Sequence, residues 1–199
     1  MPRILLVRHG ETSWNVEGRF QGLADIPLTP SGEEQAERAG IAVARMVAEG
    51  AVVKLVASSD LIRARATAEA IADAVGLGDV RAEPRLRERD VGEWSGLTVA
   101  TVEARYPGML AQWRGGQIDR IPGGESTDEV RTRALAAVLE LGASSGAADI
   151  VLAVTHGGVI RTIEDHLGIL PRGTRNLGGR WFAYEAGTLV AGETVALGS

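Results

Sequence analysis

The sequence of 199 residues contains no cysteine, and this absence excludes several chemistries at once. Without thiols the chain cannot form disulfides, bind zinc through thiolates or use a cysteine nucleophile. Lysine is almost absent as well, because Lys54 is the only lysine among 21 basic residues. Because Lys54 follows Val53 and not a glycine, the phosphate-binding pattern of nucleotide triphosphatases, G-x-x-x-x-G-K-[ST], is absent. The dinucleotide pattern G-x-G-x-x-G and the metalloprotease pattern H-E-x-x-H are missing too.

Long hydrophobic runs are also lacking. No segment approaches the roughly 18 uncharged apolar residues of a membrane span, and the N-terminus lacks the long apolar region of a signal peptide. The formal net charge of -5 argues against a nucleic-acid or anionic-membrane partner. We therefore expect a cytoplasmic protein that binds neither nucleic acid nor membrane.

The residues that are present are typical of one folded domain. Hydrophobic residues make up 45% of the chain and charged residues 24%, which supports a single core over residues 1–199. Apolar strand-like runs alternate with helical patterns, which predicts an α/β fold with a largely parallel sheet covered on both faces. The expected strands are 3–7, 52–57, 80–82 and 149–155, with a terminal hairpin of 181–185 and 188–197. The expected helices are 31–49, 60–75, 98–105, 126–141 and 159–167.

Capping residues predict where several helices begin. Ser31 and Ser126 are each followed three residues later by glutamate, which is the spacing of a capping box. For the second helix, one of residues 58–60 is the expected cap. The segment 115–125 has no clear periodicity, and we expect it to form a rim loop or a lid.

Polar side chains collect where the predicted strands end. Arg8 and His9 follow the first strand, Arg63 lies one turn into the helix after the second, and His156 and Gly157 follow the strand 149–155. Ligands of open parallel sheets bind beyond the carboxyl ends of the strands, so we expect these residues to lie together. Two histidines at equivalent strand ends, each directly before a glycine, indicate a functional pair.

Such a pair allows either a zinc site or an anion site. Imidazole is a common zinc ligand, but an arginine beside His9 disfavours a bound cation. Arginine, glycine and the helix N-terminus after His156 together indicate a phosphate cradle, in which a neutral imidazole can attack phosphorus. The leaving oxygen then needs a proton from a carboxylic acid. Spacing alone leaves Glu88, Asp90 and Glu93 open for that role.

Six motifs in order along residues 3–168 then suggest a family. They are LLVRHGETSWN with GRFQG, D-x-PLT-x-x-G-x-x-QA, SSDLIRARATA, LRERDVGEWSGLT, PGGES and VTHGGVIR. In these motifs the chain resembles the histidine phosphatase superfamily, which includes cofactor-dependent phosphoglycerate mutases and related phosphatases. The resemblance implies a three-layer α/β/α sandwich of the phosphoglycerate-mutase-like type.

The resemblance also implies a role for each site residue. His9 matches the nucleophile that becomes phosphorylated, and Glu88 matches the proton donor. The phosphate pocket corresponds to Arg8, Arg63 and His156. The expected substrate-binding residues are Asn15, Gln21, Gly22 and Gly157. For a phosphatase of this type, the resemblance implies that no metal and no cofactor are needed.

The length of one segment bears on the reaction. Mutases of the family carry a long insertion between the W-R and G-E-S motifs, whereas Trp113–Gly124 spans only a dozen residues here. We therefore expect metal-independent hydrolysis of a small phosphorylated metabolite, such as a sugar phosphate or a phosphoglycerate-type ester, through a phosphohistidine. A cofactor-dependent phosphoglycerate mutase is the alternative, and a non-catalytic phosphate-binding relative is the less favoured one.

The rim is expected to select the substrate. Within residues 109–125, the side chains expected to line it are those of Trp113, Arg114, Ile118 and Arg120. The terminal hairpin could supply an edge strand for a homodimer, although simple completion of the sheet is the favoured interpretation.

Overall fold

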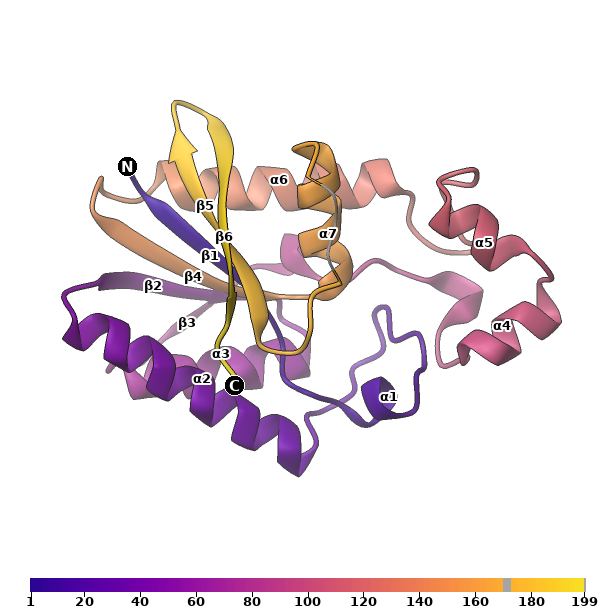
Figure 1. Cartoon of the computed structure of the whole chain (residues 1–199), viewed down its shortest axis with the longest axis horizontal. Helices are drawn as coiled ribbons and strands as arrows, with labels where there is room; N and C mark the ends of the chain where they lie inside the picture. The colour runs from indigo at the N-terminus through magenta and orange to yellow at the C-terminus, as the bar shows by residue number, and fades with distance from the viewer. Residues whose placement is uncertain (170–172, 199) are drawn as a thin grey trace.

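The computed structural model describes residues 1–169 and 173–198. Figure 1 shows the strands in the middle of the molecule, with helices above and below them. In chain order the elements are β1 (Arg3–Arg8), α1 (Ser13–Val16), α2 (Pro30–Ala48), β2 (Val52–Ser58), α3 (Ile62–Ala74), β3 (Val80–Ala82), η1 (Pro84–Leu86), η2 (Gly92–Trp94), α4 (Val99–Arg105), α5 (Met109–Arg114), α6 (Thr127–Ala143), β4 (Asp149–Thr155), α7 (Gly157–His166), β5 (Gly178–Glu185) and β6 (Thr188–Ala196). Within these residues, no helix is long and apolar enough to cross a membrane.

Six strands form one sheet in the order β3-β2-β4-β1-β5-β6. The first four of these run parallel, whereas β5 pairs antiparallel with β1 and β6 antiparallel with β5. The register of β1 and β4 pairs Arg8 with Thr155, the last residue of each strand. His9 and His156 therefore leave the sheet side by side at its carboxyl edge. The predicted, mostly parallel α/β sheet is confirmed.

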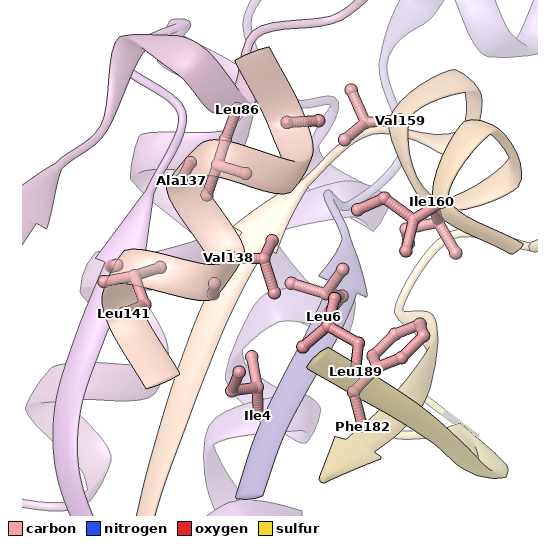
Figure 2. Packing of buried hydrophobic residues seen from close by; sticks show 14 of the residues in the cluster. Ile4, Leu6, Leu86, Ala137, Val138, Leu141, Val159, Ile160, Phe182 and Leu189 are labelled. Carbon is pink, nitrogen blue, oxygen red and sulfur yellow. The ribbon is translucent and has the colours of Figure 1, made fainter. Parts of the chain in front are cut away.

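Helices cover both faces of the sheet because the side chains of each strand alternate between them. Ile4 and Leu6 of β1 belong to the core on the side of α6 and α7, whereas Leu5 and Val7 belong to the core under α2 and α3. Figure 2 shows the first of these cores, where Val138 of α6 and side chains of α7 point toward β1. The side chains of all four of these β1 residues are fully buried. The three-layer α/β/α arrangement is thereby confirmed.

A smaller apolar cluster lies beside the carboxyl edge of the sheet. Trp94, Val102, Leu110 and Ile121 are buried in it, and Trp113 packs against them. Figure 1 shows that α4 and α5, which contribute to this cluster, extend away from the sheet. The cluster therefore lies outside the three layers. Its residues Val91 and Trp113 line the same cavity as His9.

Helix α2 begins at Pro30 because Thr29, and not Ser31, caps it. The Thr29 hydroxyl accepts a hydrogen bond from the backbone N–H of Gly32 at 3.0 Å. Proline is favoured at the first helical position, where the N–H that it lacks would have no partner within the helix. The third residue after the true cap is Gly32, so the predicted capping box with Glu34 is wrong.

The prediction that one of residues 58–60 caps α3 is also wrong. The first N–H of the helix, on Ile62, donates to the Asp25 carboxylate at 2.7 Å. The Asp60 carboxylate instead pairs with Arg87. The cap comes from a residue far away in the sequence, and a search of the residues just before the helix cannot find such a partner.

The remaining predicted boundaries agree more closely with the structure. Ser126 caps α6 and forms the predicted capping box with Glu129. Helix α7 begins at Gly157, two residues earlier than predicted and directly behind His156. The terminal hairpin is confirmed, and its turn lies at residues 186–187, whose φ angles of 46° and 91° are left-handed.

Candidate active site

Two histidines face each other at the carboxyl edge of the sheet. His9 follows β1 and His156 follows β4, and their ring centroids are 5.2 Å apart. The exposed fraction of His9 is 3%, and His156 is fully buried. No group of three or more His, Asp or Glu side chains within residues 1–169 and 173–198 could hold a metal ion, so the zinc alternative has no ligand set there.

The hydrogen bonds of His9 determine which of its ring nitrogens is available. Nδ1 donates to the carbonyl oxygen of Gly10 at 2.6 Å, so the proton of the neutral ring lies on Nδ1. Nε2 accepts a hydrogen bond from Nε of Arg63 at 3.3 Å. The lone pair of Nε2 therefore points toward a guanidinium group, where an anionic electrophile would be held.

The surroundings keep both histidine rings neutral. Burial is the largest cause that lowers the pKa of His9 well below its usual 6.5, and the charges of Arg63 and Arg8 lower it further. The pKa of His156 is lowered in the same direction, by burial first and then by Arg63. Because a neutral ring keeps a free lone pair, His9 can act as a nucleophile at neutral pH.

Arg63 and Arg8 place two positive charges beside His9. The fully buried Arg63 donates to the carbonyl oxygens of Gly22 at 2.9 Å and Ala24 at 2.7 Å. Burial lowers the pKa of Arg63 to about 10, so the group stays charged at neutral pH. Arg8 donates to the carbonyl oxygen of Thr174 at 2.8 Å. Because carbonyl oxygens already hold both groups, an anion can bind between them without a large rearrangement.

His156 offers a hydrogen-bond donor to the same space. Its Nε2 lies 2.9 Å from the hydroxyl of Ser59, and that hydroxyl already accepts from the N–H of Leu61 at 3.3 Å. When the hydroxyl donates its proton to Nε2, the ring proton of the neutral His156 lies on Nδ1. Nδ1 is buried and has no hydrogen-bond partner in the described part of the chain. An anion beside His9 would supply that partner.

Glu88 brings a carboxyl group to the opposite side of the site. Its Oε1 accepts from the N–H of Arg89 at 2.8 Å and its Oε2 from the N–H of Gly158 at 3.1 Å. A Cβ atom on Gly158 would lie only 2.3 Å from Oε1, so this position must be glycine for Glu88 to sit there. Of the three acids that spacing left open, Glu88 lines the cavity, whereas Asp90 and Glu93 do not.

These groups line one cavity of about 730 Å³. The predicted site residues along its wall are Arg8, His9, Asn15, Gln21, Gly22, Arg63, Glu88 and Gly157, and His156 lies directly behind His9. From the predicted rim, Trp113, Arg114 and Ile118 reach the cavity. Arg120 does not, because it donates to the carbonyl oxygen of Gly124 and pairs with Glu129.

The comparison with known proteins is consistent with this geometry. Residues 4–178 match the histidine phosphatase superfamily (branch 1). The chain belongs to this family.

Individual relatives of the chain are named for different activities. The chain is 39% identical to the glucosyl-3-phosphoglycerate phosphatase of Mycobacterium tuberculosis over 85% of its own length and 76% of the relative. It is 42% identical to the probable phosphoglycerate mutase GpmB of Salmonella choleraesuis, over 79% and 70% of the two chains. A structure of mycobacterial glucosyl-3-phosphoglycerate phosphatase with inorganic phosphate superimposes with a TM-score of 0.79 at 34% identity, covering 91% of this chain and 89% of the other.

The predicted substrate-binding residue Asn15 has clear structural partners. Asn15 forms a capping box with Thr12 at the start of α1, and its Oδ1 also accepts from Nδ2 of Asn176 at 3.2 Å. Asn176 donates to the carbonyl oxygen of His9 as well, at 2.9 Å. These bonds tie α1 to the backbone of His9. With Oδ1 of Asn15 occupied in this way, its amide nitrogen is left for the cavity that it lines.

Gln21 and Gly22 lie next to Arg63 in the same wall. Gln21 is 9% exposed, and its Oε1 is buried without a hydrogen-bond partner in the described residues. Gly22 has a φ of 52°, and a Cβ there would approach the Val91 side chain to 2.6 Å. Glycine is therefore required at position 22 to let its carbonyl oxygen reach Arg63.

Gly10 packs closely against the start of α2. A Cβ on Gly10 would lie 2.6 Å from the carbonyl oxygen of Gly32 at the start of α2. Glycine is thus required by the packing of α2 against the strand end. Its N–H donates to the Thr67 hydroxyl of α3 at 3.0 Å, which further fixes the loop after β1.

Reasoning from the sequence missed Arg89, which is the least expected residue of the cavity. It is only 8% exposed, and its guanidinium lies over the Trp113 ring, 5.7 Å from the ring centroid. Within residues 1–169 and 173–198 this guanidinium makes no hydrogen bond or ion pair, and burial lowers its pKa. A buried cation with free donors is a candidate for substrate binding. Only its place beside Glu88 could have drawn attention to it.

Proposed function

We propose that the chain is a phosphomonoester hydrolase that transfers the phosphoryl group first to His9 and then to water. The observation that carries this proposal is the state of Nε2 of His9. It is the unprotonated nitrogen of the ring, its lone pair accepts a hydrogen bond from Arg63, and the ring stays neutral because it is buried beside two arginines. A carboxyl group, Glu88, lines the same cavity.

In the first step Nε2 of His9 attacks phosphorus in line with the ester oxygen. An N–P bond forms while the P–O ester bond breaks, and the departing oxygen takes a proton from the Glu88 carboxyl group. Arg8, Arg63 and the Nδ1 proton of His156 stabilise the charge on the three equatorial phosphate oxygens. All three groups are buried or held by carbonyl oxygens, so they need little reorganisation.

In the second step water attacks the phosphohistidine. The Glu88 carboxylate accepts a proton from this water, a P–O bond forms, and the N–P bond breaks to return the electron pair to Nε2 of His9. Inorganic phosphate leaves, and both His9 and Glu88 are restored to their starting protonation states. No step requires a metal ion or a cofactor.

Hydrolysis is favoured over mutase chemistry by the segment after α5. A mutase must keep the phosphorylated intermediate of its substrate in the site until the phosphoryl group returns. Here Gly115, Gly116, Ile118 and Asp119 of this segment line the cavity, so the rim at this place offers no basic side chain to hold a phosphorylated intermediate. Such a rim leaves the phosphohistidine open to water. Release of inorganic phosphate from a phosphoglycerate, measured against interconversion of its isomers by NMR, separates the two activities.

Arg89 suggests which esters the cavity accepts. Its free guanidinium presents a planar fork of donors that matches a carboxylate. The named substrate of the mycobacterial relative, a glucosyl-3-phosphoglycerate, carries a carboxylate on the alcohol side of the phosphate ester. We therefore favour small carboxylate-bearing phosphate esters as substrates, with Arg89 binding the leaving group while Arg8 and Arg63 bind the phosphate.

The proposal is tested by His9→Ala, with His166→Ala as a matched control, because His166 is the chain's third histidine, exposed at the end of α7. We expect His9→Ala to abolish release of phosphate and to prevent transfer of ³²P from a labelled ester to the protein. The control should keep the wild-type rate. Turnover by His9→Ala within tenfold of the wild type would contradict the proposal and favour a mere binding role for the histidine.

A further inference from the structure

The segment that carries Glu88 has no regular secondary structure. Glu88 lies between η1 and η2, where residues 88–91 belong to no helix or strand. Neither a helix nor a sheet ladder therefore fixes the backbone of Glu88, whose carboxyl group must reach the leaving oxygen. Before Glu88, the segment is anchored to the core by Leu86, which is fully buried and whose carbonyl oxygen accepts from the Thr155 hydroxyl at 2.8 Å. The Glu88 carboxylate accepts from the N–H of Gly158, and two side chains of a different part of the chain hold the backbone around it.

The first of these side chains is Arg133 of α6. We call residues 85–91, which carry Glu88, the acid segment. The Arg133 guanidinium donates to three of its backbone carbonyl oxygens: those of Arg85 at 2.8 Å, Arg87 at 2.6 Å and Glu88 itself at 3.0 Å. A single planar fork thus binds three of four consecutive peptide units. Lysine could not reproduce this pattern, because its ammonium group is a compact point charge.

The second side chain is Glu125, which precedes the cap of α6. Its carboxylate accepts from Nε and Nη2 of Arg133 at 2.9 and 2.8 Å, which is a two-bond ion pair. The Glu125 carboxylate also accepts from the N–H of Asp90 at 2.9 Å, and the backbone N–H of Glu125 donates to the carbonyl oxygen of Asp90 at 2.9 Å. The pair therefore holds the backbone at Glu88 with Arg133 and two residues later with Glu125.

A glycine allows this close approach. A Cβ on Gly124 would lie only 2.4 Å from the carbonyl oxygen of Asp90, so any other residue would push the two segments apart. Both members of the ion pair are half-buried, with side-chain exposures of 19% for Arg133 and 26% for Glu125. Nearly all of their donors and acceptors bond to the acid segment or to each other. An exposed surface ion pair makes fewer such bonds and contributes little to stability.

We infer that Arg133 and Glu125 are positioning residues that hold Glu88 where it can protonate the leaving oxygen. This inference rests on the proposed function, because it concerns the position of the same proton donor, Glu88. Neither residue lines the cavity, so both act through the backbone of the acid segment. A carboxyl group displaced by a fraction of an ångström loses much of its effect on proton transfer.

Such a role makes a specific kinetic signature. A proton donor matters most when the leaving group is a poor one, such as an alkoxide, and least when it departs easily as nitrophenolate. Loss of positioning at Glu88 should therefore slow alkyl phosphates more than p-nitrophenyl phosphate. A merely structural role of Arg133 and Glu125 would lower the amount of folded enzyme and slow both esters equally.

The test compares kcat/KM for an alkyl phosphate and for p-nitrophenyl phosphate in Glu125→Gln and Arg133→Lys. Glu125→Gln is nearly isosteric and is the milder change, so it keeps the test valid if Arg133→Lys does not fold. The matched control is Arg180→Lys, which alters the Arg180–Glu164 ion pair between β5 and α7, with side-chain exposures of 12% and 3%. Glu88→Gln sets the ratio expected when the proton donor is removed altogether.

We expect both positioning variants to lose about tenfold or more in kcat/KM for the alkyl ester and clearly less for p-nitrophenyl phosphate. Arg180→Lys should leave the ratio of the two esters unchanged. If Glu88→Gln shifts the ratio and the two variants do not, the inference is wrong while the proposed function stands. If Glu88→Gln itself does not shift the ratio, the assignment of Glu88 in the proposed function is wrong.

Discussion

At the scale of single residues, three buried or half-buried arginines of the cavity fall into two groups. Arg8 and Arg63 lie with His9, and their donors are partly engaged by backbone carbonyl oxygens. Arg89 lies under the rim near Trp113 with its donors free. The first group is positioned for the phosphate that every substrate shares, and Arg89 for whatever distinguishes one substrate from another.

Replacement of Arg89 should therefore change the choice of substrate more than the rate of the chemical step. We expect Arg89→Met to raise KM for carboxylate-bearing phosphate esters by about tenfold or more, since a hydrogen bond to a charged group contributes about 1.5–3 kcal/mol. Esters with neutral leaving groups should be little affected. Steady-state kinetics on a matched pair of esters measure this, with Arg45→Met on the exposed face of α2 as the control. An equal rise in KM for both esters would rule out binding of a carboxylate by Arg89.

The sequence predicted these residues unequally. His9 and His156 could be found because each follows a buried strand, and parallel strands bring their carboxyl ends together. Glu88 could not be chosen by spacing, because the acid segment is irregular and side chains there do not alternate in a regular way; only the family resemblance pointed to it. Arg89 was missed because nothing in a local pattern distinguishes a buried arginine from an exposed one.

At the scale of elements, helix ends near the site depend on contacts that are distant in the sequence. The start of α3 carries Arg63, and its first N–H is bonded to Asp25 from the loop before α2. This bond joins the loop that contains the Arg63 acceptors Gly22 and Ala24 to the helix that contains Arg63 itself. Local capping patterns predicted α6 correctly and α3 wrongly for this reason.

Removal of this cap should destabilise the protein. We expect Asp25→Ala to lower the free energy of unfolding by about 1 kcal/mol, which is typical for the loss of a helix cap. Asp25→Asn should lose less, because the amide oxygen can still accept the bond from Ile62. Urea denaturation followed by circular dichroism provides the measurement. Equal losses in the two variants would mean that the hydrogen bond at Ile62 is not what Asp25 contributes.

At the scale of the whole molecule, the fold keeps two neutral histidines in its interior, and this links stability to pH. Above the usual histidine pKa of 6.5, neither the folded nor the unfolded chain protonates these rings. Below it, the unfolded chain takes up protons that the folded chain does not, because the pKa values of His9 and His156 are lowered on folding. Stability must therefore fall as the pH drops below 6.5.

The size of this fall can be checked with a substitution. Between pH 7.5 and 5.5, each buried histidine should remove up to about 1.4 kcal/mol from the free energy of unfolding. In His156→Gln only His9 remains as a buried histidine. We therefore expect the histidine-dependent fall in its free energy of unfolding over this range to be about half that of the wild type. Urea denaturation at the two pH values is sufficient. The same loss in both proteins would show that His156 is protonated equally in the folded and unfolded chains.

The distribution of charge also leads us to expect activity without a metal ion. Arg8 and Arg63 supply beside His9 the positive charge that a metal would otherwise bring to a transferring phosphoryl group. The rate of phosphate release should therefore be unchanged after treatment with EDTA. Activity that disappears on chelation and returns only with added Mg²⁺ would contradict the proposed chemistry.

The central claim is that the phosphoryl group passes through His9 in two successive in-line displacements. Each in-line displacement inverts the configuration at phosphorus, so two of them restore it. The most direct measurement is the stereochemical course of hydrolysis of a chiral, isotopically labelled thiophosphate ester in labelled water. We expect overall retention of configuration at phosphorus. Overall inversion would mean that water attacks the ester directly, and it would contradict the phosphohistidine intermediate.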